Sequence, residues 1–82
     1  MLVGDVVESY VRGRVRRGEI RVLTARNLRM VLGQFAQVNP VECSRLTRRH
    51  VLRWLESIEH LAQSTRRNRL TVVRSFCEGV GL

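Results

Sequence analysis

The 82-residue chain contains no lysine, one proline, two cysteines and only four aromatic residues. It also has no apolar run longer than four residues, so the sequence predicts no membrane-spanning segment. Acidic side chains stand among the first eight residues. A secretory signal peptide needs positive charge there, so we expect no export by that route. The length predicts a single small domain over residues 1–82, because folding would hide only about 60–65% of the unfolded surface.

Residues that carry catalytic or metal chemistry are few and scattered. Cys43 and Cys77 are 34 positions apart and belong to no C-x-x-C motif, so the sequence predicts neither a disulfide nor a zinc site. His50 and His60 are expected at the surface or at helix ends. Glycine-rich phosphate loops and nucleophile elbows are missing as well. We therefore predict no catalytic residue, no metal ion and no cofactor, and the chain by itself is not expected to be an enzyme.

Arginine is the residue that the sequence has in excess. Fifteen arginines against seven acidic residues give a formal net charge of +8. A balance this basic is typical of nucleic-acid binding, with an anionic membrane surface as the second interpretation. Guanidinium groups pair bidentately with phosphates and with guanine edges, although a GC-rich genome would favour arginine over lysine whatever the function. The composition therefore predicts a polyanionic partner.

Apolar side chains recur at helical spacing in four segments, and no segment alternates with a period of two. The first predicted helix spans residues 2–17 and stops near Gly18. The second follows Thr24 as its N-cap and ends at Asn39, before the single proline. Phe35 falls on the apolar stripe of this second helix, which predicts a place in the core.

The third and fourth predicted helices carry similar signals. Thr47 is the predicted N-cap of the third helix, which extends to Leu61. The fourth begins at Ser64 or Thr65 and frays near Gly79. Hydrophobic staple pairs flank the two capping threonines: Leu23 with Leu28, and Leu46 with Val51. Together the four helices predict a compact all-α four-helix bundle.

The polar faces of the second and fourth helices carry the strongest functional signal. Arg26 and Asn27 lie off the apolar stripe of the second helix, and residues 64–69 open the fourth. Cations at a helix start oppose the positive end of the helix dipole, which attracts phosphate instead. A sequence that tolerates this conflict is expected to place an anion there. The plainer interpretation is that the hydroxyl residues cap their helices and the arginines form a solvated face.

Three stretches of the chain together resemble one known family. They are Leu23-Thr-Ala-Arg-Asn-Leu with the apolar helix through Phe35, Leu46-Thr-Arg-Arg-His-Val-Leu-Arg-Trp-Leu, and Leu61-Ala-Gln-Ser-Thr-Arg-Arg-Asn-Arg-Leu with Val73-Arg-Ser-Phe76. Over residues 4–76 the chain resembles the N-terminal SAM-like, or core-binding, domain of tyrosine recombinases and phage integrases. The last stretch, with the pattern sT-x-n-r-x-l-x-x-(L/V)-R-x-F, is the most specific part of the resemblance.

The resemblance implies a four-helix bundle that forms half of a C-shaped clamp around duplex DNA. Its second and fourth helices would face the major groove of a core-type recombination site, and a separate catalytic domain of the same parent protein would form the other half. The only tyrosine, Tyr10, is not assigned as a DNA-cleaving nucleophile. We therefore expect a non-catalytic DNA-binding fragment that is monomeric in isolation, binds no membrane, and acts in the cytoplasm of a bacterial or phage-infected cell. The residues predicted to contact double-stranded DNA are Thr24, Arg26, Asn27, Ser64, Thr65, Arg66, Arg67, Asn68 and Arg69.

Two other functions are compatible with the same sequence. A helical protein–protein adaptor would use its charge for an acidic partner and would expose an apolar groove. A helix-turn-helix regulator needs two helices joined by a turn of three or four residues, and the predicted gap at residues 61–63 is compatible with that. Such a regulator normally dimerises, and the sequence shows no spare apolar stripe for a dimer. The role of a second basic cluster stays open: Arg12, Arg14, Arg16, Arg17 and Arg21.

Overall fold

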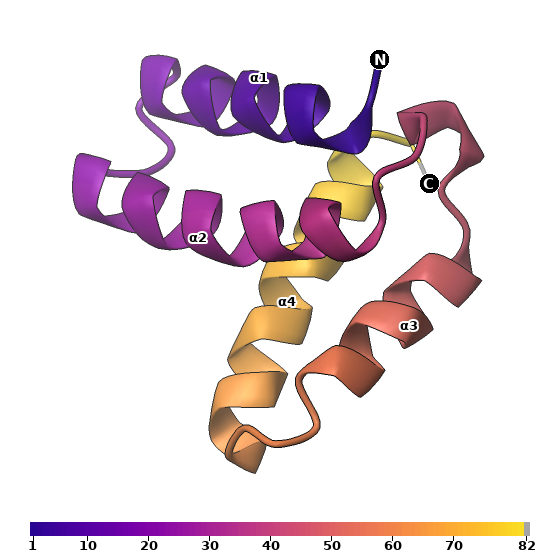
Figure 1. Ribbon diagram of the computed structural model, residues 1–82. Coiled ribbons are helices and arrows are strands. Elements are labelled where there is room, and N and C mark those ends of the chain that lie inside the picture. Colours follow the sequence, from indigo (N-terminus) through magenta and orange to yellow (C-terminus); the bar gives the residue numbers. More distant parts are fainter. Residues whose placement is uncertain (82) are drawn as a thin grey trace.

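The computed structural model describes residues 1–81 as a bundle of four α-helices (Figure 1). The elements are α1 (Val3–Arg16), α2 (Val22–Val38), a 3-10 turn η1 (Cys43–Arg45), α3 (Arg48–Ser57) and α4 (Gln63–Gly79). α1 and α2 form an antiparallel pair, α4 crosses α2, and α3 runs antiparallel beside α4. With a radius of gyration of 12.1 Å, this confirms the predicted compact all-α four-helix bundle. None of the helices within residues 1–81 is long and apolar enough to cross a membrane.

The turn between α1 and α2 explains where the second helix begins. Gly18 has a φ of +73°, the left-handed conformation that glycine adopts freely, and it ends α1 as predicted. α2 then starts at Val22, so Thr24 lies inside its first turn and its assignment as the N-cap is wrong. The helix starts early because Ile20 packs against the core and anchors the preceding turn. Leu23 is 76% exposed, so the predicted Leu23–Leu28 staple is wrong as well.

The start of α3 follows the sequence prediction and its end does not. Thr47 is the N-cap, and its backbone N–H donates to Nδ1 of His50 at 3.0 Å in a capping box. Leu46 beside it is buried, as a staple residue should be. The helix ends at Ser57, four residues before the predicted end at Leu61. Leu61 still packs against the core, but from the turn that follows α3.

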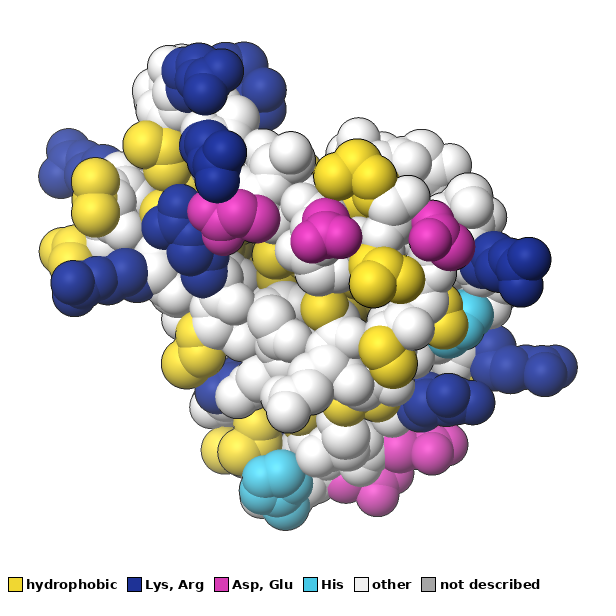
Figure 2. Space-filling view, turned by 45° about the horizontal axis from the view of Figure 1, so that its top comes forward, with side chains coloured by type: hydrophobic (Ala, Val, Ile, Leu, Met, Phe, Trp, Pro, Cys, Tyr) yellow, Lys and Arg dark blue, Asp and Glu magenta, His cyan; other side chains and the backbone are white. Residues whose placement is uncertain are grey.

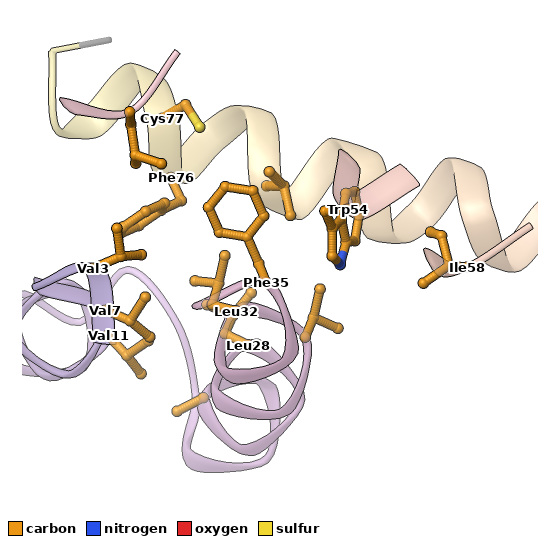
Figure 3. Close-up of a cluster of buried hydrophobic side chains, with 14 residues drawn as sticks. Val3, Val7, Val11, Leu28, Leu32, Phe35, Trp54, Ile58, Phe76 and Cys77 are labelled. Carbon is orange, nitrogen blue, oxygen red and sulfur yellow. The ribbon is translucent and has the colours of Figure 1, made fainter. Parts of the chain in front are cut away.

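All four helices contribute side chains to one hydrophobic core (Figure 3). Phe35 of α2 packs edge-on against Trp54 of α3 and Phe76 of α4, with ring centroids 5.9 and 6.4 Å apart. Tyr10 of α1 packs edge-on against the same Phe76 at 5.2 Å. Such edge-to-face pairs add to the stabilisation from burial alone. Phe35 is therefore a core residue, as predicted, and Trp54 is fully buried beside it. Cys77 is buried and carries a free thiol.

A buried asparagine joins the end of α2 to the start of α3. The Nδ2 atom of Asn39 donates to the carbonyl oxygens of Phe35 at 3.3 Å and His50 at 3.1 Å. The N-terminal segment fixes the same connection from the other side, because the backbone N–H of Val3 donates to the carbonyl of Val41 at 2.9 Å. The bonds from Asn39 satisfy its buried amide nitrogen, and they hold the start of α3 against the end of α2.

Replacing Phe35 with alanine should lower the free energy of unfolding by about 3–5 kcal/mol, because the ring contacts both α3 and α4. Urea denaturation followed by circular dichroism measures this change. Leu52→Ala is the matched control, since Leu52 is 53% exposed, and its effect should stay within about 0.5 kcal/mol. If the two variants unfold at the same urea concentration, Phe35 does not hold the bundle together.

Candidate nucleic-acid interface

A hollow between α2 and α4 gathers four of the residues predicted to contact DNA. Asn27 reaches it from α2, and Thr65, Asn68 and Arg69 reach it from α4. The three α4 residues share one face because helical neighbours recur every three or four positions. The hollow has a volume of about 370 Å³. Its lining is completed by Met30, Val31 and Val72. We call this surface the α2–α4 hollow.

Arg69 is held by a residue that sequence reasoning missed. Its Nη1 atom donates a hydrogen bond to Oε1 of Gln34 at 2.7 Å, which ties α4 to α2. Gln34 follows Asn27 by seven positions, so both lie on the same face of α2. That spacing is the signal that could have revealed Gln34, although the residue has no charge and belongs to no motif. The candidate surface therefore combines uncharged amides with one oriented guanidinium group.

Arg66 and Arg67 lie on the other flank of α4. They line a groove beside α3, together with Glu56 and Glu59. The structure thus divides the predicted run at residues 64–69 between two faces. Thr65, Asn68 and Arg69 turn toward α2, whereas Arg66 and Arg67 turn toward α3. Their contact with DNA stays a prediction.

Three predicted residues are exposed outside the lining of the hollow. Thr24 and Arg26 lie in the first turns of α2, and Ser64 lies in the first turn of α4. Arg26 forms no ion pair with any acidic group within residues 1–81. Neither α2 nor α4 has a side-chain cap, so the capping interpretation is wrong for Thr24, Ser64 and Thr65. The hydroxyl groups of these residues therefore do not cap the N-termini of α2 and α4.

The expected conflict between arginines and the dipole of α4 is smaller than the sequence suggested. α4 begins at Gln63, so Arg66, Arg67 and Arg69 are its fourth, fifth and seventh residues. The dipole effect falls off within the first turn, and only Arg66 borders that turn. The case for an anionic partner therefore depends on the chemistry of the α2–α4 face and not on the helix end alone.

Ion pairs divide the second basic cluster, at the turn between α1 and α2. Glu19 forms ion pairs with Arg14 and Arg17 of this cluster. Glu8 forms ion pairs with Arg12 of the cluster and with Arg29 of α2. Arg16 and Arg21 are exposed and have no acidic partner in the described part of the chain. Figure 2 shows basic side chains gathered at this end of the molecule, with a second group at the opposite edge. The net charge is therefore spread over both ends.

Comparison of the chain with protein-family models, curated proteins and solved structures gives no match. Within the range 1–81, no three histidine, cysteine, aspartate or glutamate side chains cluster closely enough to hold a metal ion. The candidate interface is therefore assigned from the geometry and chemistry of the chain's own residues.

Glu19 should titrate below the ordinary glutamate pKa of 4.5. A hydrogen bond from Arg17 lowers the pKa of its carboxyl group most, partial desolvation opposes this, and the charges of Arg17 and Arg14 add to the lowering. A lowered pKa in the folded state stabilises the turn above the ordinary pKa, and this contribution is lost as the pH falls through the lowered value. Carbon-13 NMR of the carboxyl group measures the midpoint, which should rise in Arg17→Gln. An unchanged midpoint in that variant would contradict the assigned cause.

Proposed function

We propose that the chain is a DNA-binding domain that grips duplex DNA through α2 and α4. One observation carries the proposal: four residues predicted from sequence to contact DNA line a single hollow, although they come from two helices. Those residues are Asn27, Thr65, Asn68 and Arg69. Helical periodicity alone places Thr65, Asn68 and Arg69 on one face of α4, but it does not place that face beside Asn27. Their convergence is therefore an independent support for a shared surface.

The chemistry of the hollow suits the edges of base pairs. An asparagine can make two hydrogen bonds to an adenine edge in the major groove, and an arginine can do the same with guanine. Asn27 and Asn68 are the amides of the hollow, and Arg69 is its guanidinium group. Arg21 and Arg26 lie at the start of α2 without acidic partners in the described range, where they can bind phosphates. This arrangement separates base readout from backbone positioning.

The resemblance to recombinase core-binding domains adds a biological setting to this proposal. In that setting the chain is a SAM-like half-clamp on a core-type recombination site, in the cytoplasm. The catalytic domain of the same parent protein encloses the other side of the DNA and cleaves it. The present chain then supplies affinity and register and takes no part in the chemistry.

A specific observation favours a second candidate function, a protein–protein adaptor. Leu52 is 53% exposed and lines a groove between α3 and α4 with the half-buried Leu55 and Leu70. Leu55 and Leu70 pack at the edge of the core and stay partly accessible beside Leu52. The groove and the α2–α4 hollow lie on opposite flanks of α4, so substitutions can separate the two functions.

The helix-turn-helix alternative is less compatible with the structure. α3 ends at Ser57 and α4 begins at Gln63, which leaves the five residues 58–62 between the helices. The predicted gap at residues 61–63 is therefore wrong, and the observed link exceeds the usual turn of three or four residues.

Arg69→Ala should weaken binding to a fluorescently labelled duplex by about fivefold or more, because it removes a contact inside the hollow. Arg53→Ala is the charge-matched control: Arg53 is exposed on α3 and lines neither the hollow nor the groove. Its effect should stay below about twofold. Fluorescence anisotropy at about 50 mM and about 200 mM salt gives both affinities and the salt dependence.

Equal losses in the two variants would mean that DNA responds only to net charge. The absence of binding by the parent protein at the lower salt concentration would contradict the DNA-binding function. In that case the groove of Leu52, Leu55 and Leu70 would become the main candidate.

A further inference from the structure

We infer that two exposed apolar side chains of α2, Leu23 and Met30, contact the methyl groups of thymines in duplex DNA. This inference rests on the proposed function, and it names a base feature that the same surface reads. It makes both residues determinants of specificity, with A·T base pairs as their target. Neither residue was among the predicted DNA contacts.

Leu23 and Met30 are unusual for their exposure and for their position. They are 76% and 47% exposed. Single exposed apolar residues are common on protein surfaces, so their exposure alone carries no conclusion. Their position is more informative. Residues 23, 27, 30 and 34 follow one another at intervals of four, three and four, which places them on one stripe of α2. The two apolar residues therefore share a face with the amides of Asn27 and Gln34.

Met30 also lines the α2–α4 hollow with Asn27 and Asn68. An A·T pair presents a matching set of groups in the major groove: the N6 and N7 atoms of adenine, which an asparagine can bond, and the methyl group of thymine. Met30 follows Asn27 by three positions and so shares its face of α2, which would bring it close to a base pair that Asn27 binds. The flexible thioether of methionine can adjust to such a contact.

The charges beside this stripe favour DNA over a protein partner. Arg26 lies between Leu23 and Met30 in the sequence and has no acidic partner among residues 1–81. Duplex DNA offers negative charge and apolar methyl groups together, so it suits both Arg26 and the two apolar side chains. A second copy of the chain carries a formal net charge of +8, which makes it a less suitable partner for Arg26 than a polyanion. The groove beside α3, which contains Leu52, Leu55 and Leu70, is the better protein-binding surface.

Replacing thymine by uracil tests the inference without changing the protein. A short duplex of alternating dA and dT is compared with the same duplex containing deoxyuridine, which keeps the base pairing and the phosphate charge but lacks the methyl group. The parent protein should bind the thymine duplex about fourfold more tightly for each methyl group that it buries. Fluorescence anisotropy at about 50 mM salt measures the ratio.

Variants then assign the preference to residues. Met30→Ala and Leu23→Ala should each bring the thymine-to-uracil affinity ratio closer to one. Leu52→Ala is the control, because it removes an equally large exposed side chain from α3, and it should keep the parent ratio. Circular dichroism confirms that each variant remains helical.

The outcomes separate this inference from the proposed function. If the parent binds both duplexes with equal affinity, the thymine contact is overturned while DNA binding stands. If it binds neither duplex, the result contradicts the proposed DNA-binding function itself. A preference that survives in both α2 variants would also overturn the inference. So would a dimer, seen by sedimentation, that dissociates in Leu23→Ala, because a second copy would then cover the stripe.

Discussion

The edge-on packing of Phe35 against Trp54 and Phe76 joins α2 to both α3 and α4. α2 and α4 cross near this aromatic junction, and their N-terminal halves diverge from it (Figure 1). The α2–α4 hollow, with Asn27 on one side and Asn68 on the other, lies between these halves. The hydrogen bond between Arg69 and Gln34 adds a second link between the two helices. The spacing of the candidate DNA-binding residues therefore depends on a side chain that does not touch the surface.

Features with a local cause could be predicted from the sequence. The apolar stripe of the second predicted helix places Phe35 in the core, and Thr47 is a cap as predicted because α3 begins directly after it. Thr24 shows the same cap signal and was assigned wrongly, since the preceding turn is anchored by Ile20 and lets α2 begin earlier. Capping preferences are worth about 1 kcal/mol, so tertiary packing can override them.

Features of the site that depend on the crossing of helices could not be predicted. Helical spacing separates Asn68 and Arg69 from Arg66 and Arg67, but only the packed structure shows which pair faces α2. The hydrogen bond between Arg69 and Gln34 joins residues 35 positions apart, and no local pattern indicates it. The ion pair between Glu8 and Arg29 also joins two helices, so counting charges along the sequence does not show that Arg29 is neutralised.

The central claim is that one face, formed by α2 and α4, binds duplex DNA. An NMR titration of backbone amide shifts with a short duplex at two salt concentrations tests it most directly. The account predicts salt-sensitive shifts concentrated in residues 23–34 of α2 and 64–69 of α4, with small shifts along α3. Shifts spread evenly over every arginine-rich segment, or confined to the groove between α3 and α4, would contradict it.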